Sequence, residues 1–189
     1  MSSKIISRLS RLDITLICEP DEAGNALYRV LSRTRAAVDR RWPCPSSVGT
    51  DCDILIVKHF EGLEKRYPWM PGEATAAVVL LLPSHGRFDP DAVQAALPDG
   101  LLFQTANPGI VLSVLSMAWD HFSYHRRQNA RIAQLDDNIR SLRDVERAKT
   151  VLMQERKINE TNAFKALRQE AMEKRIPVSR LAKLIVDNR

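Results

Sequence analysis

The first half of the chain alternates continuous apolar runs with amphipathic patterns of helical period. We predict strands at 13–20, 35–42, 52–57, 74–83 and 101–109. The apolar runs within 52–57 and 74–83 are typical of buried parallel strands. Residues 21–34 carry an apolar stripe of helical spacing, and 89–100 begin with a capping aspartate followed by proline. This alternation predicts an α/β fold, a flavodoxin-like, doubly wound parallel sheet.

Two of the connections between these strands are too short or too interrupted for a full helix. Only eleven residues separate Trp42 from Ile54, and they include two prolines and a glycine. Residues 60–73 contain two prolines and two glycines. We therefore expect any helix in these two connections to be short.

The pattern of the second half of the chain differs from that of the first half and predicts long helices. Residues 110–156 contain neither proline nor glycine, and within them four apolar residues step by 3, 4 and 3, as in a heptad seam: Ile132, Leu135, Ile139 and Leu142. A helix packed on its own domain would also explain this seam. A parallel homodimer is favoured, because nothing nearby in the sequence remains to cover it. We predict a receiver-like domain at 1–120, a coiled-coil helix at 121–143 and an all-α domain of three helices at 144–189.

Charge separates the two halves. Residues 126–189 carry 16 basic and 9 acidic side chains, a net charge of +7, whereas the rest carries 12 basic and 14 acidic, a net charge of −2. A basic C-terminal region favours a polyanionic partner.

The pattern of residues 145–186 resembles the ANTAR family of bacterial RNA-binding transcription antiterminators. The residues that carry the resemblance are Val145-Glu146-Arg147-Ala148-Lys149, Val151-Leu152-Met153, Ala163-Phe164, Leu167-Arg168, Ala171, Pro177-Val178, Leu181-Ala182 and Ile185-Val186. The order of the whole chain looks like the amidase-regulator type within this family. The resemblance implies a dimer that binds stem-loops of a leader mRNA and prevents a terminator hairpin from forming. It also implies a sequestering partner, a cytoplasmic ligand sensor of the periplasmic-binding-protein type.

The apolar stripes of the tail divide its residues between a small core and a basic surface. Residues 159–175 are predicted to form a helix with Asn159 as its N-cap, and the apolar stripe of this helix is Ala163, Phe164, Leu167, Ala171 and Met172. Phe164 is assigned to the core, which leaves no aromatic side chain for base stacking and predicts recognition of RNA shape and backbone. The candidate RNA-binding residues are Lys149, Arg156, Arg168, Lys174, Arg175, Arg180 and Lys183. A solvated helix face is the alternative explanation for each of them.

The first half resembles a response-regulator receiver that has lost its phosphorylation site. Where such receivers carry the phosphate-accepting aspartate, five residues after Asp53, this chain has Lys58. The magnesium-binding acids are represented by Glu19 and Asp21, and the usual Lys-Pro by Asn107 and a proline. An ammonium cannot accept a phosphoryl group and would repel Mg²⁺. We predict that Lys58 pairs with Glu19 or Asp21; an exposed lysine is the alternative.

Several function classes are disfavoured. No phosphate-binding glycine loop and no nucleophile constellation occurs, so we expect a non-enzyme without a cofactor. His121 and His125 have a metal-ligand spacing but no arguable third ligand, so no metal is predicted and a polar part of the seam is preferred. The apolar runs are too short to span a membrane, no secretory signal is recognisable, and we expect a cytoplasmic protein.

Two other functions remain open. A basic three-helix tail can be a DNA-binding helix-turn-helix, which would make this a DNA-binding response regulator with a degenerate receiver. The absence of glycine after Gly109 speaks against the short glycine-containing turn of that motif. A pure interaction module, with a dimerising helix and a charged end, is the third possibility.

Overall fold

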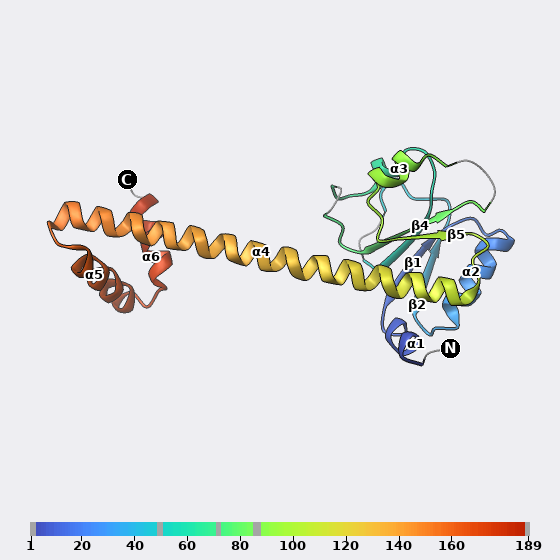
Figure 1. The fold of residues 1–189 in the computed structure, drawn as a ribbon, viewed down its shortest axis with the longest axis horizontal. Coiled ribbons are helices and arrows are strands. Elements are labelled where there is room, and N and C mark those ends of the chain that lie inside the picture. Colours follow the sequence, from blue (N-terminus) through green and yellow to red (C-terminus); the bar gives the residue numbers. More distant parts are fainter. Residues whose placement is uncertain (1–2, 49–50, 71–72, 85–87, 188–189) are drawn as a thin grey trace. The chain divides into compact units, whose positions relative to one another are not determined.

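The computed structural model describes residues 3–48, 51–70, 73–84 and 88–187. The chain divides into two compact units, residues 1–126 and residues 127–189, and the long helix α4 (Pro108–Arg156) contributes to both (Figure 1). The division into three domains proposed from the sequence is finer than these two units, and its boundaries stay a prediction.

The first unit is built on a five-stranded, all-parallel sheet. Its strands are β1 (Asp13–Ile17), β2 (Ala37–Arg41), β3 (Ile54–Lys58), β4 (Ala77–Leu82) and β5 (Gly100–Phe103), in the order β2-β1-β3-β4-β5. This order, with helices on both faces, confirms the predicted doubly wound fold. All residues of β4 are buried, as expected of a central parallel strand.

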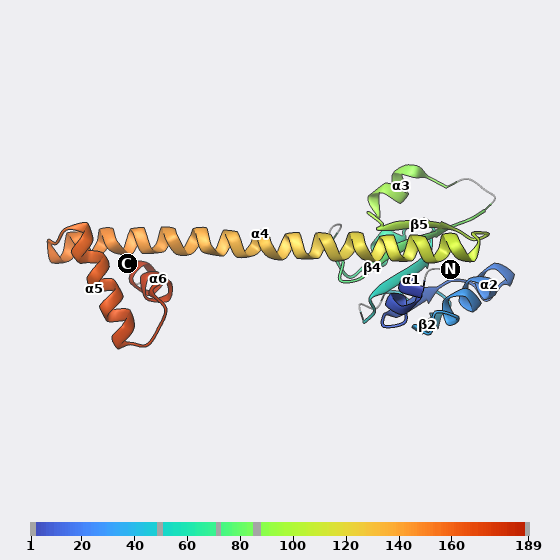
Figure 2. The same cartoon turned by 60° about the horizontal axis from the view of Figure 1, so that its bottom comes forward.

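Helices cover the two faces of the sheet unequally (Figure 2). One core cluster joins the sheet to residues of α2 (Glu22–Ser32) and of the first part of α4, and α1 (Ser3–Leu9) packs there too. Gly100 lets β5 approach α4 closely, because a Cβ there would lie 3.0 Å from Val114. The opposite face carries only the 3₁₀ turn η1 (Leu63–Arg66) and the short α3 (Pro90–Ala95). The four-residue η1 agrees with the short helix expected in the connection that follows β3.

The second unit contains the end of α4 with α5 (Glu160–Glu173) and α6 (Val178–Asp187). Its core is small and consists of alanines and leucines from all three helices. Asn159 caps α5 as predicted, its side chain accepting from the Asn162 backbone N–H at 2.9 Å. The turns that precede α5 and α6 use Lys157 and Arg175 in the left-handed conformation, with φ of 49° and 53°. Non-glycine residues thus make both turns, which explains how the tail bends without glycine.

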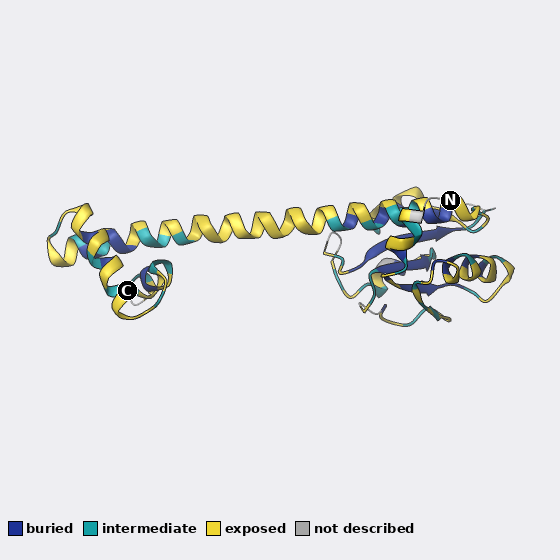
Figure 3. Cartoon of the chain, turned by 90° about the horizontal axis from the view of Figure 1, so that it is seen from below, coloured by how far each residue is buried: buried dark blue, intermediate teal, exposed yellow. Residues whose placement is uncertain are grey.

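From residue 124 to residue 140, α4 is exposed on every side (Figure 3). Three residues of the predicted seam lie in this stretch and Leu142 lies just beyond it; Ile132, Leu135, Ile139 and Leu142 are 47–66% exposed. Isolated helices gain little stability from propensity alone and usually need packing of an apolar face. This stretch therefore retains an uncovered apolar stripe within the single chain.

Candidate functional site

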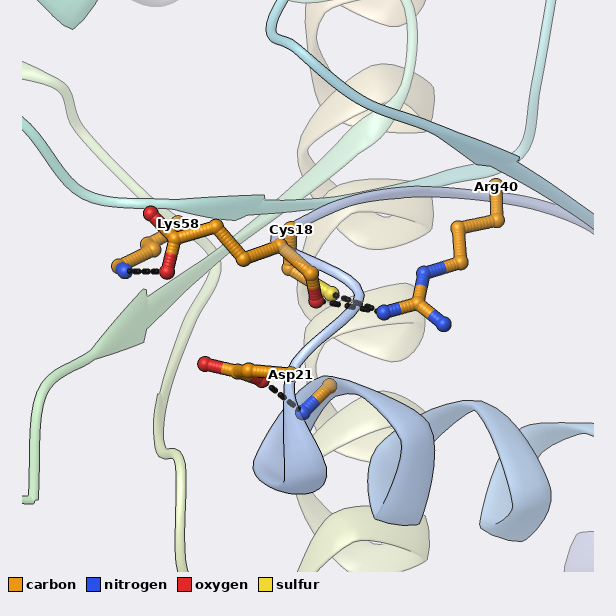
Figure 4. Close-up of polar contacts among 6 residues, drawn as sticks. Cys18, Asp21, Arg40 and Lys58 are labelled. Atoms are coloured by element: carbon orange, nitrogen blue, oxygen red, sulfur yellow. Dashed lines mark hydrogen bonds and ion pairs between the residues drawn. The ribbon is translucent and has the colours of Figure 1, made fainter.

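The carboxyl ends of β1 and β3 bring Glu19 and Lys58 together. Ile17 pairs with Val57 in the parallel register, so the residues that follow leave the sheet at the same edge. Lys58 Nζ donates to Glu19 Oε2 at 2.7 Å, and the two side chains are 25% and 41% exposed (Figure 4). The ion pair predicted from the sequence is present. A half-exposed pair of this kind contributes about 0.2–1 kcal/mol.

Asp21 and Asn107 have structural roles at this edge. The Asp21 side chain accepts from the Gly24 backbone N–H at 2.7 Å and so caps α2 (Figure 4). Asn107 Oδ1 accepts from the Ile110 backbone N–H at 3.0 Å, at the beginning of α4. Of the two acids offered as partners for Lys58, the one that pairs with it is therefore Glu19. That these positions derive from a lost phosphorylation site stays a prediction.

The backbone of Glu19 is held by close contacts. Arg40 Nη2 donates to the Glu19 carbonyl oxygen at 2.5 Å, and Arg40 Nη1 donates to Asn25 Oδ1 at 2.7 Å. Gly24 makes room for this arrangement, since a Cβ there would lie 2.2 Å from the same carbonyl oxygen. Burial raises the pKa of the neighbouring Cys18 thiol, against the opposing effect of Arg40. The thiol is therefore protonated at neutral pH and a poor nucleophile.

We expect the purified protein to take no phosphate from acetyl phosphate in the presence of Mg²⁺. The ammonium of Lys58 occupies the strand end where an acceptor carboxylate would be needed, and it neutralises Glu19. Intact-mass spectrometry should show the unmodified mass only, for wild type and for a Lys58→Met variant. A phosphoryl adduct that disappears in an Asp53→Asn or Glu19→Gln variant would contradict the prediction.

The predicted RNA-binding cations differ in whether a carboxylate pairs with them. Arg156 and Lys174 both contact Glu170, at 3.5 and 2.8 Å, and the hydrogen bond from Lys174 is the main reason that the pKa of Glu170 is lowered. Within the described residues, no ion pair is formed by the other exposed cations of the set: Arg168, Arg175, Arg180 and Lys183. These four are the side chains most available to a polyanion.

Lys149 was predicted on a solvent face, and this is wrong. Its side chain is only 11% exposed, and Nζ lies 2.9 Å from Glu146 Oε2 and 2.6 Å from Glu160 Oε1. The hydrogen bond to Glu160, then that to Glu146, raises the pKa of Lys149, and Lys149 in turn lowers the pKa of Glu160. Lys149 thus links α4 to the beginning of α5 rather than pointing into solvent.

We predict that Lys149→Met lowers the melting temperature of the all-α unit. The variant leaves two carboxylates facing each other without the ammonium between them. Because the folded pKa of Glu160 lies below its ordinary value of 4.5, the contribution of this contact is present above that pH and is lost as the pH falls through the folded pKa. The difference in melting temperature between wild type and variant, followed by circular dichroism, should therefore shrink at acid pH. An unchanged difference there would argue against the ionic link.

Phe164 was predicted in the core, and this is also wrong. The buried positions of α5 are Ala163, Leu167 and Ala171, spaced by four residues, whereas Phe164 is 43% exposed. Met172, assigned to the same stripe, is 70% exposed. The buried face of α5 is therefore narrower than the apolar pattern indicates.

The histidine pair on α4 is tied to its own domain. His121 Nδ1 lies 2.9 Å from Asp99 Oδ1, and His125 Nε2 lies 3.0 Å from His121 Nε2. The link to Asp99 joins residues 22 apart in the chain and has no sequence signal. Within the part of the chain that the structure describes, no group of three or more His, Cys, Asp or Glu side chains is placed to hold a metal ion. Within the same part, no helix has both the length and the apolarity needed to cross a membrane.

Comparisons with known proteins give one match within the second unit and one along nearly the whole chain. Residues 133–186 match the family model of the ANTAR domain. The whole chain is 24% identical over 194 residues to the aliphatic amidase regulator of Pseudomonas aeruginosa, a match that covers 99% of this chain and 97% of that protein. These two matches confirm the resemblance seen in the sequence.

Among solved structures, the response regulator StyR has a similar fold. The match covers 95% of this chain and 100% of StyR, with a TM-score of 0.53 and 15% sequence identity. At this identity the likeness concerns the fold, and it confirms the receiver-like architecture of the first unit.

Proposed function

We propose that this protein is an RNA-binding transcription antiterminator. Its residues 133–186 match the ANTAR domain, and it is similar to the aliphatic amidase regulator along nearly its whole length. The comparisons support an antiterminator-type regulator with a receiver-like domain. The proposal adds what this regulator binds, how many chains act together and what controls them.

The observation that supports the proposal is the set of exposed cations on the all-α unit that form no ion pair among the described residues. The matched region contains a small three-helix core, around which Arg168, Arg175, Arg180 and Lys183 are exposed without a carboxylate partner among the described residues. Basic side chains dominate affinity for nucleic-acid phosphates, and arginine also stacks on unpaired bases. Stem-loops of a leader mRNA offer both groups.

The protein acts as a homodimer in this proposal. The uncovered stripe at Ile132, Leu135, Ile139 and Leu142 has the spacing of a coiled-coil seam. A dimer presents two ANTAR units to one transcript, so tandem stem-loops would be bound with high effective concentration. Holding the stem-loops prevents the competing terminator hairpin from forming.

Control comes from a partner rather than from phosphorylation. The Lys58–Glu19 ion pair occupies the place where phosphate and Mg²⁺ would be handled in a receiver. We therefore assign regulation to sequestration by a cytoplasmic ligand sensor of the periplasmic-binding-protein type, which releases the dimer when inducer binds. No catalytic role is assigned to any residue.

A binding experiment tests the proposal against a DNA-binding function. Fluorescence anisotropy would compare the full-length protein on the leader RNA of its own operon, the same sequence as duplex DNA, and an unrelated stem-loop of equal length. We expect tighter binding to the leader RNA than to both controls at physiological salt. Preference for the duplex DNA would favour the DNA-binding response regulator, and absence of all binding would favour an interaction module.

A further inference from the structure

The exposed ring of Phe164 lies beside unpaired positive charge. Phe164, Arg168 and Met172 follow one another at intervals of four residues on α5, and all three are exposed. Side chains four apart on a helix are neighbours, with about 5–6 Å between their Cβ atoms. We call these three residues the Phe164 strip. It combines an aromatic face, a guanidinium and a flexible apolar side chain.

The strip lies outside the buried core of its own unit. The core cluster of the all-α unit contains Ala163, Leu167 and Ala171 from the adjacent face of α5 and excludes Phe164. Within the described residues, Arg168 forms no ion pair. Phe164 thus leaves two-fifths of its surface in water beside a cation whose charge is not neutralised. That combination suits a partner with a flat π surface and negative charge nearby.

We propose that the Phe164 strip is a stacking site for one unpaired base of an RNA loop. The inference rests on the proposed RNA-binding function and adds the position where the loop is read. A nucleobase would lie on the Phe164 ring, while Arg168 contacts the adjacent phosphate or the edge of the base, and Met172 packs against the sugar. A regular A-form duplex buries its base faces between neighbouring pairs, so the strip selects loops over stems.

The test uses full-length protein and a single leader stem-loop in which each unpaired loop adenine is replaced in turn by 2-aminopurine. Stacking on an aromatic ring quenches the fluorescence of this base. We expect quenching at one loop position with wild type, and its loss in Phe164→Ala together with an affinity lower by about 5- to 150-fold. Phe164→Tyr keeps a ring and should retain both signals.

Phe164→Leu provides a folded apolar control if the alanine variant is unstable, with circular dichroism melts confirming the fold of each variant. It should bind like Phe164→Ala, because it retains apolar contact without an aromatic face. Wild-type affinity and quenching in Phe164→Leu and Phe164→Ala would overturn the stacking site but leave RNA binding intact. Failure of wild type to bind the stem-loop would overturn the proposed function, and the stacking site with it.

Discussion

We expect the Leu135→Lys variant to lose the homodimer and, with it, most of the affinity for RNA that carries two stem-loops. Leu135 is 52% exposed in the single chain and lies at an inner position of the predicted seam. Burying the exposed half of a leucine contributes about 1–1.5 kcal/mol per chain, or about 2–3 kcal/mol per dimer. The dimer dissociation constant should therefore rise by about 30- to 150-fold from lost burial alone, and further from apposed ammonium groups.

The effect of Leu135→Lys on RNA affinity depends on how many stem-loops the RNA probe contains. A dimer engages a second stem-loop at high effective concentration, an advantage of about 10²- to 10⁴-fold that a monomer lacks. Leu135→Lys should thus bind the tandem RNA as weakly as wild type binds a single stem-loop, and the two proteins should be equal on the single stem-loop. Analytical ultracentrifugation and fluorescence anisotropy give the two quantities.

Gln134→Lys is the matched control for this variant. Gln134 is exposed on α4 next to Leu135 but lies off the seam, so the same charge is added without entering the proposed interface. It should remain a dimer with wild-type affinity for the tandem RNA. A Leu135→Lys protein that stays dimeric, or a wild type that is monomeric at micromolar concentration, would show that the seam does not serve dimerisation.

Replacing together the four unpaired, exposed cations of the all-α unit should weaken RNA binding strongly. The variant changes Arg168, Arg175, Arg180 and Lys183 to glutamine. If each contacts one phosphate, the slope of log K against log salt falls by about 3, and affinity near 0.15 M salt falls by about 10²- to 10³-fold. The buried core of the unit is unaffected, because all four side chains are exposed.

Arg156→Gln with Lys174→Gln is the matched control for charge. Both side chains share Glu170 in the folded unit, so their charge is already partly neutralised. The double variant should lose less affinity per removed charge than the fourfold variant, and its salt slope should change little. Equal losses per charge in the two variants would mean that the protein attracts RNA through its net charge and not through a defined surface.

The sequence predicted those parts of the fold that depend on a periodic or continuous pattern. The five strands, the short α3 with its Asp89 cap and the α5 cap at Asn159 follow from local signals, and the structure confirms them. The helix α1 was not predicted, because it spans only seven residues and its apolar pattern is interrupted by charge. Its Arg8 forms an ion pair with Asp120, a contact between residues 112 apart that no local pattern could reveal.

The candidate sites show the same division between local and tertiary information. The Lys58–Glu19 pair could be predicted, because the carboxyl ends of adjacent parallel strands must meet. Lys149 and Phe164 could not be placed correctly. A helical stripe gives the direction of the buried face but not its width, and Phe164 falls just outside it. The contact of Lys149 with Glu160 depends on how the chain turns between α4 and α5.

The most direct test of the account is single-round transcription in vitro through the leader of the protein's own operon. Wild-type protein should raise the fraction of polymerase that reads through the leader terminator, with no change in the number of transcripts initiated. The fourfold cation variant should leave read-through at the level of protein-free reactions. Unchanged read-through accompanied by altered initiation would contradict antitermination and would place the protein on promoter DNA instead.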